Sequence, residues 1–321
     1  MNLHTNTTLF RQSLRAVSTR NGISEVFVEK DYWITLVLLQ LAESAYASQV
    51  VFKGGTSLSK GYGCIHRFSE DVDVAVITNP DASGNAVKTL LRQVEKSMMS
   101  ELREIHLEGV SSKGSRFRKT VVEYPTIQAN ALTKQANTLT NRLILEVNSF
   151  ANPYPFHQAH IRSMIAEFFE QEQRADFLEE YGLHGFTLNI LAKEQTLVEK
   201  MVSLFRSSFD QYPLQGLGQK IRHFYDVYYL MEDADCLSFV GAGKFTEEFH
   251  RLFAHDKAIF DDPQGWRMKS YTQSPLVSEE FPAIWQQLST RYREELSALA
   301  FAPIPDEHAV AERFLALVRR L

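Results

Sequence analysis

Few features of this sequence point to secretion, to a membrane or to disorder. It has two cysteines, Cys64 and Cys236, among 321 residues, and their spacing matches neither a disulfide framework nor a zinc site. No apolar run reaches the length that spans a membrane, and the first residues lack the charged-then-apolar layout of a signal peptide. Low-complexity tracts and internal repeats are missing as well. We therefore expect a cytoplasmic protein with two buried cysteines.

An excess of positive charge is also missing. The formal net charge is -5 at pH 7, which argues against a protein coated with positive potential, as a general nucleic-acid binder would be. Residues 113–119 are a local exception, because they contain four basic residues and Phe117. This composition is expected either of a phosphate-backbone contact with a stacking ring or of a solvated hairpin.

The chain is longer than one compact core usually is, and 44% of its residues are apolar. Helical and strand-like runs alternate as far as Pro153 and Pro155, and almost everything beyond these prolines has the pattern of helices. We therefore predict two domains. Residues 1–160 would be mixed α and β, and residues 161–321 would be helical.

A strand-like run that ends in two glycines, residues 50–57, is the first motif that indicates chemistry. Gly54 and Gly55 have no β-carbons, so their turn lets the backbone approach a ligand closely, and the helix start that follows offers unpaired N–H groups to an anion. Phosphate is the ligand expected at such a turn. A Walker-type loop would need a glycine directly before its lysine, whereas Ser59 precedes Lys60.

Two aspartates on the next expected strand predict a metal site. In Asp71-Val72-Asp73-Val74 both carboxylates point to one face and both valines to the other, because side chains alternate along a strand. Two carboxylates on one face repel each other unless a cation lies between them. Hard oxygen ligands suit Mg²⁺, which takes one or two carboxylates and leaves its other positions to water and phosphates.

Other charged residues are candidates with alternatives. Glu146 lies in an otherwise apolar strand-like run, residues 142–148, where it would be costly to bury unpaired. Beside the aspartate strand it becomes a third metal or base carboxylate; otherwise it is an edge-strand glutamate. Lys200 shares an apolar helical stripe, so its ammonium either faces a shielded site or snorkels at a helix edge. Asp226 and Arg222 are one helical turn apart and can simply pair.

Four motifs together resemble the AbiEii/AbiGii toxin family of nucleotidyltransferases. They are Gly54-Gly55-Thr56-Ser57-Leu58-Ser59-Lys60, Arg67-Phe68-Ser69-Glu70-Asp71-Val72-Asp73, Glu199-Lys200 and Tyr225-Asp226-Val227-Tyr228. The resemblance implies the DNA polymerase β-like nucleotidyltransferase fold. This is an α+β fold with a small mixed sheet flanked by helices, followed here by a helical C-terminal domain.

The same resemblance assigns residues to the site. The residues that would hold a nucleoside triphosphate (NTP) are Gly54, Gly55, Thr56, Ser57 and Lys60. Asp71 and Asp73 would bind magnesium. Lys200 and Asp226, from the helical half, would belong to the active site, the lysine near phosphate and the aspartate as a base or positioning group. Glu146 is carried over only from the broader fold, in which a third strand carboxylate is usual.

The function implied is that of a magnesium-dependent nucleotidyltransferase, a toxin of a toxin–antitoxin or phage-defence system. It would move a nucleotide from NTP to RNA, with tRNA the acceptor of some relatives, or to a protein side chain. A cognate antitoxin encoded nearby is the expected partner. The alternatives are a non-catalytic nucleotide-binding module that acts through complex formation and a metal-dependent phosphohydrolase. The latter is disfavoured, because a histidine-rich cluster is missing and His157 and His160 have the setting of surface residues.

Overall fold

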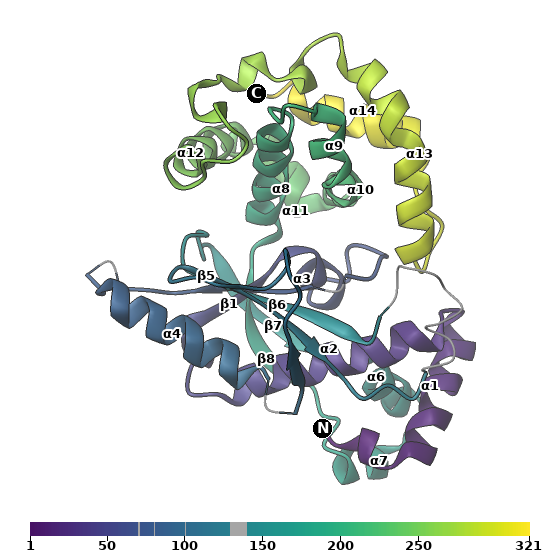
Figure 1. The fold of residues 1–321 in the computed structure, drawn as a ribbon. Helices are drawn as coiled ribbons and strands as arrows, with labels where there is room; N and C mark the ends of the chain where they lie inside the picture. Colours follow the sequence, from purple (N-terminus) through teal and green to yellow (C-terminus); the bar gives the residue numbers. More distant parts are fainter. Residues whose placement is uncertain (70, 80, 100, 129–139) are drawn as a thin grey trace. The chain divides into compact units, whose positions relative to one another are not determined.

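A computed structural model describes residues 1–69, 71–79, 81–99, 101–128 and 140–321 (Figure 1). These residues form two compact units. The first comprises Met1–Tyr62 and Phe68–Leu191, and the second comprises Gly63–Arg67 and Ala192–Leu321. The first unit thus extends beyond residue 160, after which the sequence predicts the domain boundary. The division of the chain into two functional domains stays a prediction. None of the described helices is both long and apolar enough to cross a membrane.

An eight-stranded mixed sheet forms the centre of the first unit, in the order β3-β5-β6-β2-β1-β8-β7 with β4 paired to β5. The strands are β1 (Val50–Lys53), β2 (Asp71–Val76), β3 (Arg103–Ile105), β4 (Ser112–Lys113), β5 (Phe117–Glu123), β6 (Arg142–Asn148), β7 (Phe156–Ile161) and β8 (Phe186–Leu191). β2 runs antiparallel to β1 and parallel to β6. The predicted mixed α+β class is therefore confirmed.

Helices pack on this sheet. Those of the first unit are α1 (Thr7–Asn21), α2 (Glu25–Glu43), α3 (Gly54–Lys60), α4 (Gly84–Ser97), α6 (Met164–Gln171) and α7 (Ala175–Glu180). In Figure 1, α2 and α4 run along one face of the sheet. α2 is buried on nearly all sides, as expected of a helix that is apolar all round, yet it also buries Glu29, Lys30 and Asp31.

The second unit consists of helices around an aromatic core. They are α8 (Lys193–Ser207), α9 (Pro213–Gly218), α10 (Ile221–Leu230), α11 (Ala234–Gly241), α12 (Lys244–Ile259), α13 (Phe281–Leu299) and α14 (Glu307–Val318). Phe224 of α10 packs against Trp285 and Phe314, at 5.0 and 4.9 Å between ring centroids. Residues 63–67 are attached to this unit, where the Phe301 N–H donates a hydrogen bond to the carbonyl preceding Arg67, at 3.0 Å.

Some local predictions from the sequence are wrong. The helical pattern expected beyond Pro155 does not hold for β7 and β8. β7 is an edge strand whose exposed residues include His157 and His160, so its apolar alternation is weak. The segment 210–219, predicted to be a loop, contains α9, which begins with Pro213, a residue well suited to a first helical turn.

Candidate active site

β2 is a central strand that carries both predicted aspartates. Val72 and Val74 are fully buried, whereas Asp71 and Asp73 are half-buried. This burial pattern is the alternation expected of a strand with one face in the core. Glu70, which precedes them in the motif, lies outside the described residues.

Glu146 lies directly beside the aspartates. β6 runs parallel to β2, and the register places Glu146 opposite Asp73. The two side chains share a hydrogen bond. Because β6 is flanked by β2 and β5, the alternative that Glu146 is an edge-strand residue is wrong. The structure therefore brings three acidic side chains together from two neighbouring strands.

This crowding affects the proton affinity of Asp73. Burial raises the pKa of Asp73 well above its usual value, and the charges of Glu146 and Asp71 raise it further, against a smaller opposing effect of Lys53. Like charges held at close range disfavour the ionised form. Asp73 therefore keeps a proton at a pH where an ordinary aspartate has lost it, unless a cation takes the proton's place.

Lys119 neutralises one member of the acidic group. It lies opposite Glu146 in the antiparallel pairing of β5 with β6, and its Nζ is 2.6 Å from Glu146 Oε1. Burial alone would lower the pKa of Lys119, but hydrogen bonding to Glu146 and the nearby aspartate charges raise it above its usual value. Lys119 thus stays charged and forms an ion pair with Glu146.

The donor set suits a cation that also carries other ligands. Among the described residues, no group of three or more His, Cys, Asp and Glu side chains is placed so that it could hold a metal ion by itself. With Glu146 paired to Lys119, the pair Asp71 and Asp73 offers hard oxygen atoms from one face of a strand. Mg²⁺ is commonly held by one or two carboxylates together with water and substrate phosphates, so these residues fit magnesium.

The glycine turn lies against Asp73. Gly54 has a φ of +81°, and a β-carbon at this position would lie 2.2 Å from Asp73 Oδ2. Only glycine meets both conditions without strain, because it lacks the side chain and tolerates positive φ. The sequence predicts a close approach between this turn and a ligand; the observed approach is to Asp73.

The hydroxyl groups after the turn make local contacts. The Thr56 hydroxyl donates to the backbone carbonyl of Asp71, and the Ser57 hydroxyl donates to the carbonyl of Gly54 at 2.9 Å. Thr56 and Ser57 are both buried. Their side chains thus brace the turn, and their predicted contact with a triphosphate, like that of Gly55, stays a prediction.

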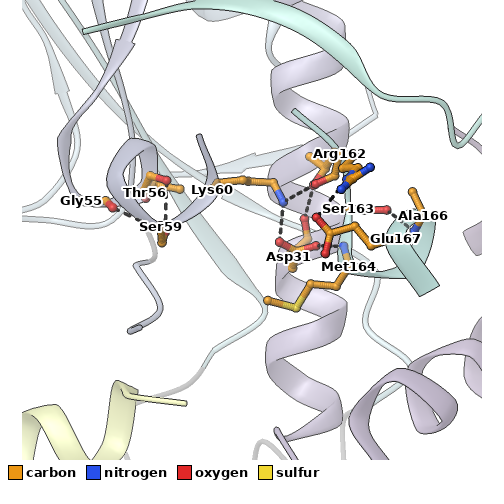
Figure 2. A network of polar contacts seen from close by, with 11 residues as sticks. Asp31, Gly55, Thr56, Ser59, Lys60, Arg162, Ser163, Met164, Ala166 and Glu167 are labelled. Carbon is orange, nitrogen blue, oxygen red and sulfur yellow. Dashed lines mark hydrogen bonds and ion pairs between the residues drawn. The ribbon is translucent and has the colours of Figure 1, made fainter. Parts of the chain in front are cut away.

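Lys60 has a partner that the sequence analysis did not identify. Figure 2 shows its side chain reaching from α3 to α2 and to the start of α6. Its Nζ lies 2.5 Å from Asp31 Oδ1 and donates to the Arg162 carbonyl at 3.0 Å. The predicted triphosphate contact of Lys60 stays a prediction, but its ammonium is engaged inside the first unit.

Lys200 and Asp226 lie together in the second unit, with Arg67 as a third member. Asp226 is fully buried; its Oδ2 lies 2.6 Å from Lys200 Nζ, and both its oxygens accept hydrogen bonds from Arg67, at 2.7 and 2.6 Å. Burial would raise the pKa of Asp226, but the two cations hold it well below its usual value. Their predicted action on the nucleotide stays a prediction.

This cluster overturns two interpretations of the sequence. Arg222 pairs with Glu295, at 3.2 Å, so the proposed pairing of Arg222 with Asp226 is wrong. The alternative that Lys200 snorkels at a helix edge is also wrong, because its side chain is only 7% exposed. The role of Arg67 was missed, although an aspartate on an apolar helix needs a cation from elsewhere.

The basic segment 113–119 is a hairpin whose cations are mostly paired. β4 and β5 form it, and Lys113 and Arg118 both contact Glu95, each at 2.6 Å, while Lys119 contacts Glu146. Because these pairs use three of its four basic side chains, the hairpin interpretation is favoured over a free phosphate-binding loop.

Comparison with known proteins identifies the family of this chain and a similar fold. A family model described as "Nucleotidyl transferase AbiEii toxin, Type IV TA system" matches residues 36–317. Among solved structures, the chain is similar to MenT4, a nucleotidyltransferase toxin from Mycobacterium tuberculosis H37Rv, with a TM-score of 0.54 and 17% sequence identity. The match covers 95% of this chain and 89% of that one. At this identity the likeness concerns the fold. No curated protein matches the chain.

Proposed function

This chain belongs to the AbiEii family of nucleotidyltransferase toxins of type IV toxin–antitoxin systems, and from that premise we propose that it transfers a nucleotide from an NTP to RNA. Asp71 and Asp73 would bind the Mg²⁺ ion that accompanies the triphosphate. The single observation that carries the proposal is the acidic group of Asp71, Asp73 and Glu146 beside the glycine turn.

The backbone of Gly54 and Gly55 would cradle the phosphates, because the turn has no β-carbons to keep them away. Magnesium, when bound, neutralises charge on the triphosphate and on the departing pyrophosphate. Asp71 and Asp73 set its place on the sheet. Because the pKa of Asp73 is raised, a bound cation would compete with a proton for this carboxylate.

Glu146 would act as the base for the acceptor hydroxyl. The hydroxyl proton passes to the Glu146 carboxylate, while the hydroxyl oxygen bonds to the α-phosphorus and the bond to the pyrophosphate oxygen breaks. Lys119 supports this role, since its contact at 2.6 Å from Glu146 holds the carboxylate in place on the sheet. A positioned base of this kind typically contributes about 10²–10⁴-fold to a rate.

Labelling is the direct test of this proposal. The full chain is incubated with each α-labelled NTP, Mg²⁺ and total RNA, and we expect label in RNA, with the tRNA fraction examined first. Asp73→Asn and chelation of Mg²⁺ should each abolish labelling. Asp176→Asn is the matched control, because Asp176 pairs with Arg174 on an exposed part of α7.

Two results would count against the proposal. If label is found only on protein, the acceptor is a protein side chain and not RNA. No label at all, with Asp73→Asn as harmful to cells as the native chain, would remove transfer as the basis of toxicity.

The family also implies an antitoxin partner, and we propose that the gene beside this one encodes it. Co-expression of that gene with this chain should relieve growth inhibition.

A further inference from the structure

The ion pair of Asp31 with Lys60 is separate from the acidic group and well buried. The two side chains are 9% and 7% exposed, and their charged atoms lie 2.5 Å apart. Asp31 Oδ2 also accepts a hydrogen bond from the Met164 N–H at 2.8 Å, and Lys60 also donates to the Arg162 carbonyl. A buried pair is costly unless such additional hydrogen bonds satisfy it. Figure 2 shows these contacts meeting where α2, α3 and the start of α6 come together.

The pair holds one end of the helix that begins with the glycine turn. Gly54 is the first residue of α3 and Lys60 is the last. Near the start, the Thr56 hydroxyl donates to the carbonyl of Asp71. Just past the end, the Tyr62 hydroxyl donates to a carbonyl of β8 at 2.8 Å. α3 is therefore attached at its start to the aspartate strand and at its end to α2, α6 and β8.

For Lys60 to reach a phosphate, its ammonium would have to leave Asp31. That movement would leave the Asp31 carboxylate buried without its cation, which is strongly unfavourable. It would also remove the contact between Lys60 and the Arg162 carbonyl. The observed arrangement thus opposes the use of Lys60 as a mobile phosphate ligand.

We propose that Asp31 and Lys60 are positioning residues of the nucleotide site. Through their pair they fix the far end of α3, and thereby the place of Gly54 and Gly55 beside Asp73. This inference rests on the proposed function, since it concerns how the same turn meets a triphosphate. It changes the role of Lys60 from a ligand of phosphate to an anchor of the helix.

Two measurements on the full chain test the proposal. Hydrogen–deuterium exchange of residues 54–61 reports the order of α3 without any nucleotide. Calorimetry with Mg²⁺ and the α,β-methylene analogue of each ribonucleoside triphosphate reports affinity. The variants are Lys60→Met and Asp31→Asn, singly and together. Arg118→Met is the matched control, because it breaks a similarly buried pair that joins α4 to β5.

We expect both single variants to speed exchange in residues 54–61 and to weaken analogue binding by similar factors, roughly tenfold, as when a binding group is misplaced. The double variant should be no worse than either single one, because both remove the same anchor. Arg118→Met should leave exchange in this segment unchanged.

Other results would overturn the proposal. If Lys60→Met weakens binding while Asp31→Asn leaves it intact or improves it, Lys60 is a phosphate ligand. Unchanged exchange in residues 54–61 of folded variants would also refute it. Asp31→Leu combined with Lys60→Met leaves no unpaired buried charge, so this variant should fold even if the single variants do not. Exchange and affinity equal to those of the native chain in this variant would also refute the proposal. Failure of the native chain to bind any analogue would refute the proposed function, and the exchange data would still decide whether the pair anchors α3.

Discussion

Around Asp73, the packing is close enough for one added carbon atom to matter. We expect Gly54→Ala to lower the free energy of unfolding by about 1–2 kcal/mol, the usual cost of a β-carbon at positive φ, and to lower nucleotide transfer by roughly 100-fold through displacement of Asp73. Gly22→Ala is the control: Gly22 has a φ of +68° with nothing within 4 Å of a β-carbon. It should lose similar stability, measured by urea unfolding, and keep its activity.

The raised pKa of Asp73 gives stability a pH dependence of known sign. Between the ordinary aspartate pKa and the raised one, the folded chain binds more protons than the unfolded chain, so this residue lowers stability as pH rises. In the absence of metal, Asp73→Asn should remove that decline and make the protein more stable than the native chain at pH 8, although it abolishes transfer. Urea unfolding in EDTA across pH 5–8 measures this. A native-like decline in the variant would contradict the assignment.

At the scale of elements, the residue pattern predicted where a strand lies in the sequence better than it predicted which strands lie beside it in the sheet. The range 142–148 coincides with β6, because a short, mostly apolar run of this kind is typical of a buried strand. That β6 lies beside β2 depends on long-range pairing, which no local pattern specifies, so the third carboxylate stayed one of two alternatives. Asp31 was missed for a different reason. Its neighbours form an apolar helix, although Glu29-Lys30-Asp31 is a charged triplet that such a helix cannot bury without partners.

The short helix α9 makes a prediction about packing in the second unit. A β-carbon at Gly216 would lie 2.4 Å from the Ser207 carbonyl oxygen, which is backbone and cannot easily move. Gly216→Ala should therefore lower the free energy of unfolding by about 1–3 kcal/mol. Gly241→Ala, at the end of α11 with nothing within 4 Å, should instead raise it by about 0.4–1 kcal/mol. Thermal unfolding compares the two, and equal effects would count against the packing of α9.

At the scale of the whole molecule, the chain passes through the second unit before it completes the first, so the burial of one segment depends on residues made much later. Arg67 is 3% exposed and pairs with Asp226 inside the second unit, yet it is followed by residues of the first. We expect the fragment 1–191 to be cut by trypsin after Arg67 far faster than the intact chain, because the residues that bury this arginine are missing. Co-expression with residues 192–321 should restore protection. Equal cleavage of fragment and intact chain would contradict this expectation.

The pairing of Arg67 with Asp226 also has a consequence for synthesis on the ribosome. The two residues are 159 positions apart, so at usual rates of translation Arg67 waits about 8–32 s for its partner. The buried charges of the second unit can be neutralised only after most of the chain has been made. For a toxin, this order means that a prematurely ended message yields a chain whose arginine has no carboxylate to bury against, and such products should be recognised by proteases before they can do harm.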